Sequence, residues 1–369
     1  MKKVLIISNI PSPYRTALYT YLQKNQTQYR FQVLYTSRRE ADRAWTTQDE
    51  LLDTFFQDSR VVSVKGGEIG GTATRFIHIP RGLGSMLNRL SPDVIIGSEY
   101  NLSAVEALLW ARRRHIPYIN LTDGTLHSET YIGTVQKLTR RLIISGADAF
   151  LASSTKAKEK LLHWGAKEEK IVVSFLTVPV GPYAELERKP EPGRLLFVGR
   201  ISHEKGLDLL IRALTQMKEA CRLEVAGNDV DGEQAKVEAL ARELGMESRV
   251  EFLGYREGEA LLTQYRSCTA LAVPSRSDCF GLVMVEAACA GVPIGASVYA
   301  DGAYDVLTPG ENGLLADPED PKAFAEMLDT LLKTPMGGEK HRAAIAEKFS
   351  FQNAAKGYLE AVRIAEGGR

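Results

Sequence analysis

The sequence predicts an α/β protein made of two doubly wound parallel-sheet domains, and three observations lead to this prediction. Short apolar runs rich in Val, Ile and Leu alternate with helix-like segments along most of the chain, as in parallel sheets with helices on both faces. The length of 369 residues suits two domains. The alternation stops at the turn-rich run 177–193 and then restarts, which favours a domain boundary there.

The first half carries the pattern of one such domain. Apolar runs predict strands at Val4–Ser8, Phe31–Tyr35, 92–97, 115–122 and 147–152. Helices are predicted after the loop 9–15, at Ala104–Arg114 and Gln136–Leu142, and from about Thr155. Residues 37–60, which include Trp45, show no clear strand pattern. Because insertions after strands often carry specificity, we expect this run to be a mobile, acceptor-binding excursion.

The second half repeats the alternation. Strands are predicted at Leu195–Val198, Arg222–Ala226, Val250–Tyr255, Ala270–Val273, Ile294–Ala296 and Asn312–Leu315. Helices are predicted at Leu207–Leu214, after Gly281 and at Pro318–Leu332. The predicted domains are therefore 1–180 and 181–351, and the amphipathic segment 352–369 is expected to pack back on the first.

Composition and charge narrow the class of protein. The 46 basic and 46 acidic side chains balance, which disfavours a nucleic-acid partner. The four cysteines show no metal-ligand spacing, so reduced thiols, no metal and a cytoplasmic location are expected. In the N-terminal segment MKKVLIISNI, the apolar run is too short for a signal peptide, and polar residues follow it too early. No apolar run approaches the ~20 residues that span a bilayer.

The balanced total hides a difference between the halves. Residues 1–180 carry 24 Lys and Arg against 16 Asp and Glu, a net charge of +8, and the rest carries 22 against 30, a net of −8. Part of the excess lies in the run 112–114, and part on a predicted helix with Lys137, Arg140 and Arg141 on one side. Such a side suits peripheral contact with the anionic inner face of the plasma membrane. The alternative is that it is an ordinary solvated face.

Polar residues follow several strands of the first half, at the edge where open α/β sheets bind ligands. Pro13 and Arg15 follow the first strand, and Arg15 is a candidate contact for an acceptor or a phosphate. Glu99 and Asp123 end two further strands, and His127 comes shortly after. Carboxylates in this position are candidate catalytic or sugar-binding groups, and the alternative is that both cap helices.

A glycine and two cations follow the first strand of the second half. Gly199 allows the backbone to approach a ligand, and Arg200 and Lys205 lie between it and the helix Leu207–Leu214. Two cations beside a helix N-terminus can hold a diphosphate. The run is neither the GxxxxGK[ST] phosphate loop nor the GxGxxG dinucleotide fingerprint.

The stretch 274–293, PSRSDCFGLVMVEAACAGVP, reads as a turn, a glycine and a helix. Asp278 precedes the turn Phe280–Leu282, and Glu286 lies inside the helix. A helix that reached back to Asp278 would place both carboxylates on one face. Backbone N–H groups at a helix start suit phosphate, and carboxylates suit sugar hydroxyls. The alternative is a buried helix start with two solvated acids.

Four segments of the second half resemble successive motifs of retaining glycosyltransferase family 4. They are GRISHEKGLDLLIRAL, RVEFLGY, the 274–293 stretch and ENGLLADPEDPKAFAEML, in the family's order and over nearly all of 193–351. The first half resembles the family mainly in strand order and in the opening SNIPSPYR. The resemblance implies the GT-B architecture, two Rossmann-like domains facing across a cleft. It also implies metal-independent transfer of a sugar from a nucleotide donor with retention of configuration, in surface glycan or glycolipid assembly.

The resemblance assigns roles to the donor-side residues. Arg200 and Lys205 would hold the donor diphosphate, and Glu286 the ribose hydroxyls. Asp278 stands where the family usually has glutamate and would bind the transferred sugar. Backbone N–H groups at 280–282 would contact sugar and phosphate, and Asn228 and Tyr255 are expected near the base.

On the acceptor side, Asp123 falls where many members carry a histidine near the reacting carbon. Pro11-Ser12-Pro13 replaces the glycine-rich turn of many members. A UDP-sugar is the expected donor, a glycan or lipid-linked molecule the expected acceptor, and no further cofactor is expected. Two alternatives keep the fold: a non-hydrolysing epimerase of nucleotide sugars, and a non-catalytic subunit that binds them.

Overall fold

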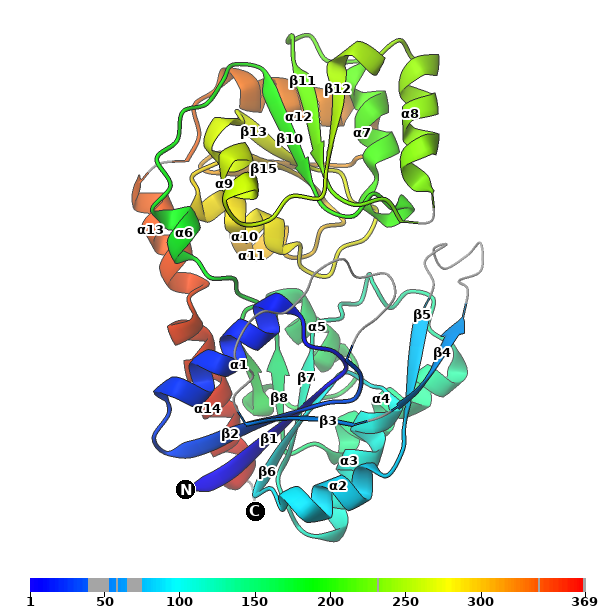
Figure 1. Ribbon diagram of the computed structural model, residues 1–369, viewed down its shortest axis with the longest axis vertical. Coiled ribbons are helices and arrows are strands. Elements are labelled where there is room, and N and C mark those ends of the chain that lie inside the picture. Colours follow the sequence, from blue (N-terminus) through cyan, green and yellow to red (C-terminus); the bar gives the residue numbers. More distant parts are fainter. Residues whose placement is uncertain (39–52, 58, 65–74, 231, 338, 368–369) are drawn as a thin grey trace. The chain divides into compact units, whose positions relative to one another are not determined.

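The structure is a computed structural model, and it describes residues 1–38, 53–57, 59–64, 75–230, 232–337 and 339–367. The chain forms two compact units (Figure 1), Met1–Thr177 with Phe351–Arg369, and Val178–Ser350. The boundary lies three residues before the expected position. Hydrogen bonds from Ser174 N to Ala152 O and from Leu176 N to Ser153 O hold the chain to the first unit up to this point. Helix α6 (Gly181–Ala184) packs against helix α10 (Leu282–Cys289) of the second unit.

The first unit is built on a seven-stranded parallel sheet with the order β3-β2-β1-β6-β7-β8-β9. Its strands are β1 (Lys2–Ser8), β2 (Tyr29–Tyr35), β3 (Thr54–Phe56), β6 (Val94–Ser98), β7 (Tyr118–Thr122), β8 (Ala149–Ala152) and β9 (Ile171–Val173). Strands β4 (Ser59–Val64) and β5 (Arg75–Pro80) form a separate antiparallel pair. The strands predicted in this half are confirmed.

One prediction for this unit is wrong. Residues 37–60 were expected to lack strands, but Thr54–Phe56 pairs with Val33–Tyr35 of β2, and β4 begins at Ser59. Three residues at a sheet edge are too few to show an alternating pattern in sequence. Trp45 and the rest of 39–52 lie outside the described residues, so the acceptor-binding role expected there stays a prediction.

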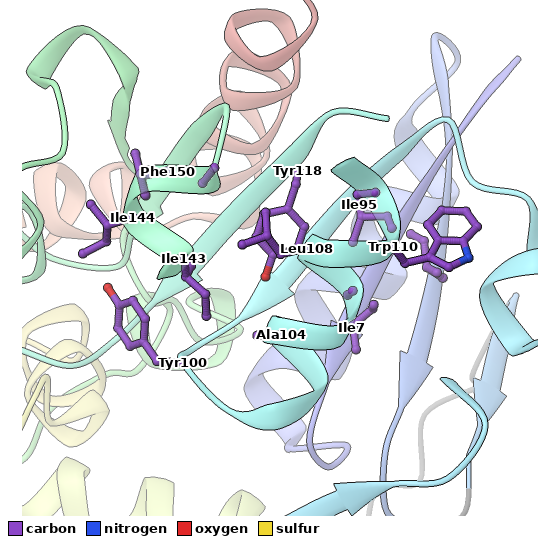
Figure 2. Packing of buried hydrophobic residues seen from close by; sticks show 14 of the residues in the cluster. Ile7, Ile95, Tyr100, Ala104, Leu108, Trp110, Tyr118, Ile143, Ile144 and Phe150 are labelled. Atoms are coloured by element: carbon purple, nitrogen blue, oxygen red, sulfur yellow. The ribbon is translucent and has the colours of Figure 1, made fainter. Parts of the chain in front are cut away.

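Helices cover both faces of this sheet. They are α1 (Pro13–Asn25), α2 (Leu83–Leu90), α3 (Leu102–Arg113), α4 (Thr134–Gly146), α5 (Thr155–His163), the 3-10 turn η1 (Glu168–Lys170) and α14 (Phe351–Gly367). Figure 2 shows side chains of one core, among them Leu108 of α3, Ile95 of β6 and Ile143 of α4. The other face is covered by α1 and by α14, whose Tyr358 and Val362 are buried with strand residues such as Val4.

The second unit has a six-stranded parallel sheet with the order β12-β11-β10-β13-β14-β15. Its strands are β10 (Arg194–Val198), β11 (Arg222–Ala226), β12 (Val250–Gly254), β13 (Ala270–Val273), β14 (Ile294–Ser297) and β15 (Gly313–Ala316). Besides α6, its helices are α7 (Leu207–Leu214), α8 (Glu233–Glu243), α9 (Gly258–Ser267), α10 (Leu282–Cys289), α11 (Ala303–Val306), α12 (Pro321–Lys333) and α13 (Glu339–Lys348), with 3-10 turns η2 (His203–Lys205) and η3 (Glu247–Arg249). These strands confirm the sequence predictions.

Helix α12 begins three residues later than expected, and its cap explains the difference. The Asp320 carboxylate accepts hydrogen bonds from Lys322 N and Ala323 N, both at 3.1 Å. Pro321 occupies the first helical position, which suits its fixed backbone angle and missing N–H. Pro318, where the helix was expected to start, therefore lies ahead of the capping turn.

Both sheets reverse their strand order once, which places a ligand-binding edge in each unit. The first sheet reverses between β1 and β6, and the second between β10 and β13. In open α/β sheets, ligands bind outside the carboxyl ends of the strands at such a reversal. Among the described residues, no helix combines the length and apolar character needed to cross a bilayer.

Candidate active site

In the second unit, the residues expected to bind the donor lie at the carboxyl ends of adjacent strands. Gly199 follows β10, Asn228 follows β11, Tyr255 follows β12, and Asp278 lies in the loop after β13. Backbone hydrogen bonds join the neighbouring loops, from Ile201 N to Asn228 O at 2.9 Å and from Gly227 N to Gly254 O at 3.0 Å. The structure therefore brings these four positions to one edge of the sheet, beside its point of reversal.

The loop 199–206 is fastened to the loop 274–281. Gly206 adopts a left-handed conformation, with φ of 65°, and a Cβ there would lie 2.1 Å from Pro274 O. Only glycine fits this close approach. Arg276 donates to His203 O at 3.0 Å and forms two hydrogen bonds of 2.7 Å with the Asp208 carboxylate. The two segments predicted to carry the donor site thus form one fixed element.

Lys205 and Asp278 form an ion pair across these two loops. The side chains are 22% and 13% exposed, so both still reach the surface. The sequence analysis assigned Lys205 to a diphosphate and Asp278 to a sugar as separate contacts. The pair links the two groups, and an anion that binds Lys205 has to compete with Asp278.

The turn before α10 supplies fewer hydrogen-bond donors than expected. The Phe280 N–H already donates to the Asp278 carboxylate at 3.3 Å, because an aspartate side chain readily bonds to the backbone two residues later. Phe280 is buried and packs edge-on against Phe349, with ring centroids 6.0 Å apart. Gly281 and Leu282 occupy the cap and the first position of α10, so their N–H groups lie at the helix N-terminus, where an anion is stabilised.

The common face that a helix reaching back to Asp278 would give to Asp278 and Glu286 is not formed. Gly281 is left-handed, with φ of 73°, and the helix starts only at Leu282. A residue in that conformation cannot continue a right-handed helix. Asp278 therefore belongs to the preceding loop, and the spacing of eight residues says nothing about its distance from Glu286.

Glu286 has two tyrosine partners that the sequence analysis missed. Tyr265 of α9 donates its hydroxyl to Glu286 Oε2 at 2.8 Å, and Tyr183 of α6 also hydrogen-bonds to this carboxyl. Burial raises the pKa of Glu286 to about 7, although both hydrogen bonds act to lower it. Neither tyrosine belongs to a recognisable motif, so no sequence signal points to them.

The remaining donor-side candidates are partly accessible. Arg200 and Asn228 are half-buried. Tyr255 is exposed, and its hydroxyl donates to Glu257 at 2.9 Å. All four cysteines are free thiols; Cys221, Cys268 and Cys289 are buried. In the part of the chain that the structure describes, no group of three or more His, Cys, Asp and Glu side chains is arranged to hold a metal ion.

In the first unit, Arg15 is placed differently from what the sequence predicts. Its side chain is buried, forms an ion pair with Asp123, and donates to the Tyr358 hydroxyl of α14 at 3.1 Å. Its guanidinium is therefore already engaged, and it is not an open contact for an acceptor or a phosphate. Pro13, the first residue of α1, is exposed, and so is His127, in the loop after β7.

Glu99 and Asp123 meet at the edge of the sheet, as the strand-end argument predicts. Glu99 accepts hydrogen bonds from Asp123 N at 2.7 Å and from the Thr122 hydroxyl at 2.9 Å. Burial raises the pKa of Glu99, and the charge of Lys160 opposes that rise. Neither carboxylate caps a helix: Asn101 caps α3, with 2.8 Å from Ala104 N to Asn101 Oδ1, and α4 begins only at Thr134.

Behind this edge lies a buried group of charges that the sequence did not reveal. Lys160 of α5 is fully buried and donates to the Thr122 hydroxyl at 2.7 Å and to Glu129 at 3.1 Å. Arg140 of α4 donates twice to the Glu129 carboxylate, at 2.7 and 2.8 Å. Both cations also lie over the Tyr100 ring, at 4.8 and 4.7 Å from its centroid. These contacts connect α4 and α5 to the end of β7.

Known protein families match most of the length of this chain. Residues 26–174 match the glycosyl transferase 4-like domain, and residues 184–349 match glycosyl transferases group 1. The D-inositol 3-phosphate glycosyltransferase of Rhodococcus jostii is 30% identical over 270 residues, 67% of this chain but only 58% of that protein. The protein of the same name from Frankia alni is 30% identical over 310 residues, 73% of this chain and 74% of that one.

Solved structures show the same fold. Anabaena Alr3699/HepE in complex with UDP and glucose has a TM-score of 0.75 and 17% identity, covering 98% of this chain and all of that one. The lipopolysaccharide outer core galactosyltransferase WaaB has a TM-score of 0.74 and 20% identity, covering 98% and 99%. The family models and the 30% identical relatives show that this chain is a glycosyltransferase of family 4, and the solved structures show that it has the GT-B fold.

Proposed function

We propose that this glycosyltransferase transfers a sugar from a UDP-sugar to a glycan or lipid-linked acceptor in surface polysaccharide assembly. The transfer retains the anomeric configuration, needs no metal ion, and takes place in the cytoplasm at the inner membrane face. The observation that carries the proposal is the arrangement at the end of β13. There Lys205, Asp278 and the N-terminus of α10 lie in one fastened pair of loops.

The donor diphosphate is held by positive charge and backbone donors. Arg200, Lys205 and the N–H groups of Gly281 and Leu282 face the phosphates, and the diphosphate displaces Asp278 from Lys205. When the bond from the anomeric carbon to the diphosphate breaks, these groups stabilise the negative charge that the diphosphate gains. Removing one such contact typically costs ~10²-fold or more in rate.

The released carboxylate of Asp278 accepts hydroxyl groups of the transferred sugar, and the Glu286 carboxylate accepts the ribose hydroxyls. Tyr183 and Tyr265 keep Glu286 in place while the ribose binds. Asn228 and Tyr255 lie beside the base. In the first unit, Asp123 is the proposed catalytic group, and the Glu99 carboxylate holds its backbone N–H. Pro13 and His127 contribute to the acceptor side.

Two sets of relatives support the donor and suggest an acceptor. Alr3699/HepE has been solved with UDP and with UDP-glucose bound, which supports a UDP-sugar here. The relatives named D-inositol 3-phosphate glycosyltransferase make an inositol phosphate a second candidate acceptor.

A donor screen followed by a transfer assay tests the proposal. UDP-, GDP-, ADP- and dTDP-sugars are compared by thermal shift, since a ligand that binds the folded protein stabilises it as RT ln(1 + [L]/Kd). The stabilising donor is then incubated with acceptor extracts and with D-inositol 3-phosphate, with and without EDTA, and the anomer formed is read by NMR. We expect a UDP-sugar to stabilise the protein and transfer to continue in EDTA with retention. An inverted product, loss of transfer in EDTA, or isomerisation of the donor without acceptor would contradict the proposal.

A further inference from the structure

We propose that residues 126–141 of the first unit, here called the 126–141 patch, bind the surface of an anionic bilayer. The patch consists of the loop after β7 and the first two turns of α4, with a cavity beside them. This inference deepens the proposed function, on which it rests for the membrane location of the acceptor. It assigns the membrane contact to named side chains. The surface that they form differs from the side of the helix that the sequence analysis predicted.

The patch exposes large apolar side chains in an unusual concentration. Leu126, Tyr131, Val135 and Leu138 are 42%, 66%, 73% and 56% exposed. They fall within 13 consecutive residues, whereas the other exposed large apolar side chains of the described residues are scattered along the chain. Val135 and Leu138 are three positions apart on α4 and so share a side of the helix. Exposed apolar side chains that gather in this way mark a surface for contact with a partner or a membrane.

The cations of α4 are divided between the interior and this surface. Sequence reasoning placed Lys137, Arg140 and Arg141 on one side, but Arg140 is buried against Glu129. Lys137 and Arg141 remain exposed, and among the described residues neither forms an ion pair. They are four positions apart, so they lie near each other on the helix. The surface thus combines apolar side chains with two unneutralised positive charges.

A cavity of about 540 Å³ opens at the same place. It is lined by Leu126, Glu129, Thr130, Ile132, Lys137, Arg141, His163 and Trp164. Its one carboxylate is already neutralised, because Arg140 and Lys160 both donate to Glu129. Burial acts to raise the pKa of Glu129, but these two cations hold it below the usual value. The cavity therefore carries net positive charge from Lys137 and Arg141 and has the volume of a small-molecule site.

Charge complementarity selects an anionic bilayer as the occupant. Apolar side chains with adjoining Lys and Arg on one helix suit the boundary between lipid headgroups and acyl chains. Tyrosine is also favoured at that depth. The net charge of +8 on residues 1–180 adds long-range attraction to an anionic surface. Leu126, Tyr131, Val135 and Leu138 enter the interface, and Lys137 and Arg141 pair with lipid phosphates at the cavity.

Vesicle binding by the full chain tests this directly. The probes are vesicles of pure phosphatidylcholine and vesicles with 30% phosphatidylglycerol, and binding is measured by sedimentation without any sugar donor. We expect the wild type to bind only the anionic vesicles. Val135→Ser with Leu138→Ser, and separately Lys137→Gln with Arg141→Gln, should each weaken that binding at least tenfold. High salt should weaken it as well.

Matched controls lie in the same unit. Leu102→Ser with Leu109→Ser removes two other exposed apolar side chains, and Lys24→Gln with Arg113→Gln removes two other exposed charges. Both should bind anionic vesicles within about twofold of the wild type. Circular dichroism and the thermal midpoint establish that every variant is folded.

Each of the following outcomes would overturn the inference. The wild type binds neither vesicle, or the patch variants bind as well as the controls. Inorganic phosphate or glycerol phosphate binds by calorimetry while vesicles do not, which would make the cavity a site for a soluble anion. The patch variants abolish a dimer seen by light scattering while vesicles do not bind, which would make the surface an interface between copies. If the protein transfers sugar but does not bind vesicles, only this inference is contradicted. If it binds vesicles but does not turn over any donor, only the proposed function is contradicted.

Discussion

Two groups of charged side chains, one in each unit, are arranged in opposite ways. In the first unit, Lys160, Glu129 and Arg140 are buried and pair with one another. In the second, Lys205 and Asp278 pair where both still reach solvent. A buried charge that loses its partner is strongly destabilising, so the first group is committed to holding the fold. The second group can exchange partners, and that is what a site for an anionic donor requires.

Lys160→Met tests the structural half of this comparison and should have the largest effect. The substitution keeps most of the side-chain volume but leaves Glu129 and the Thr122 hydroxyl with one donor fewer in the interior. We expect a loss of roughly 3–5 kcal/mol in the free energy of unfolding, measured by urea denaturation. Lys158→Met on the same helix is the control; it removes only a surface ion pair with Glu168 and should cost at most about 1 kcal/mol. A Lys160→Met protein as stable as that control would show that the buried group does not hold the fold.

Glu286 lies between the two extremes, because it is half-buried and is proposed to bind ribose. Its folded pKa of about 7 lies above the ordinary value of 4.5. The folded state therefore binds the proton more tightly, and the stability gained is complete below pH 4.5 and lost as pH rises through 7. The loss amounts to roughly 3 kcal/mol by pH 8. Urea denaturation at several pH values should show this loss for the wild type but not for Glu286→Gln. If the free energies of unfolding of the two proteins changed with pH in the same way, the pKa of Glu286 would lie near its ordinary value.

Tyr265→Phe should have a smaller effect of the same kind. The variant loses the hydrogen bond from the tyrosine hydroxyl to Glu286 Oε2, which is worth more when the carboxyl is ionised. We expect a cost of about 2 kcal/mol at pH 8 and about 1 kcal/mol at pH 5. The pH at which UDP binding changes should also move upward, as measured by calorimetry. A cost that is the same at both pH values would show that the hydroxyl does not act through the carboxylate.

The sequence predicted the parts of the fold that depend on local pattern. The strands of both sheets are apolar runs, and the edge where Glu99 meets Asp123 follows from the parallel strands that carry them. Strand β3 was missed because three residues form no pattern, whereas the start of α10 directly after Gly281 was predicted.

The sequence could not predict interactions between side chains that are distant along the chain. Arg15 is buried because Asp123 and Tyr358 surround it, 108 and 343 positions away. Lys160 reads as one more solvated lysine in a lysine-rich helix until β7 and Glu129 are placed beside it. The link between Lys205 and Asp278 likewise needs the close packing of Gly206 on Pro274. Residue types and spacing identify candidates, but only the folded chain decides which of them are already paired.

The central claim is that Lys205 leaves Asp278 for the diphosphate of the donor, and the UDP affinity of Lys205→Ala tests it most directly. Calorimetric titration with UDP would compare the wild type, Lys205→Ala, Asp278→Asn and the exposed control Lys322→Ala. The account predicts at least tenfold weaker binding for Lys205→Ala, unchanged binding for Lys322→Ala, and equal or tighter binding for Asp278→Asn. A folded Lys205→Ala protein that binds UDP as the wild type does would contradict it.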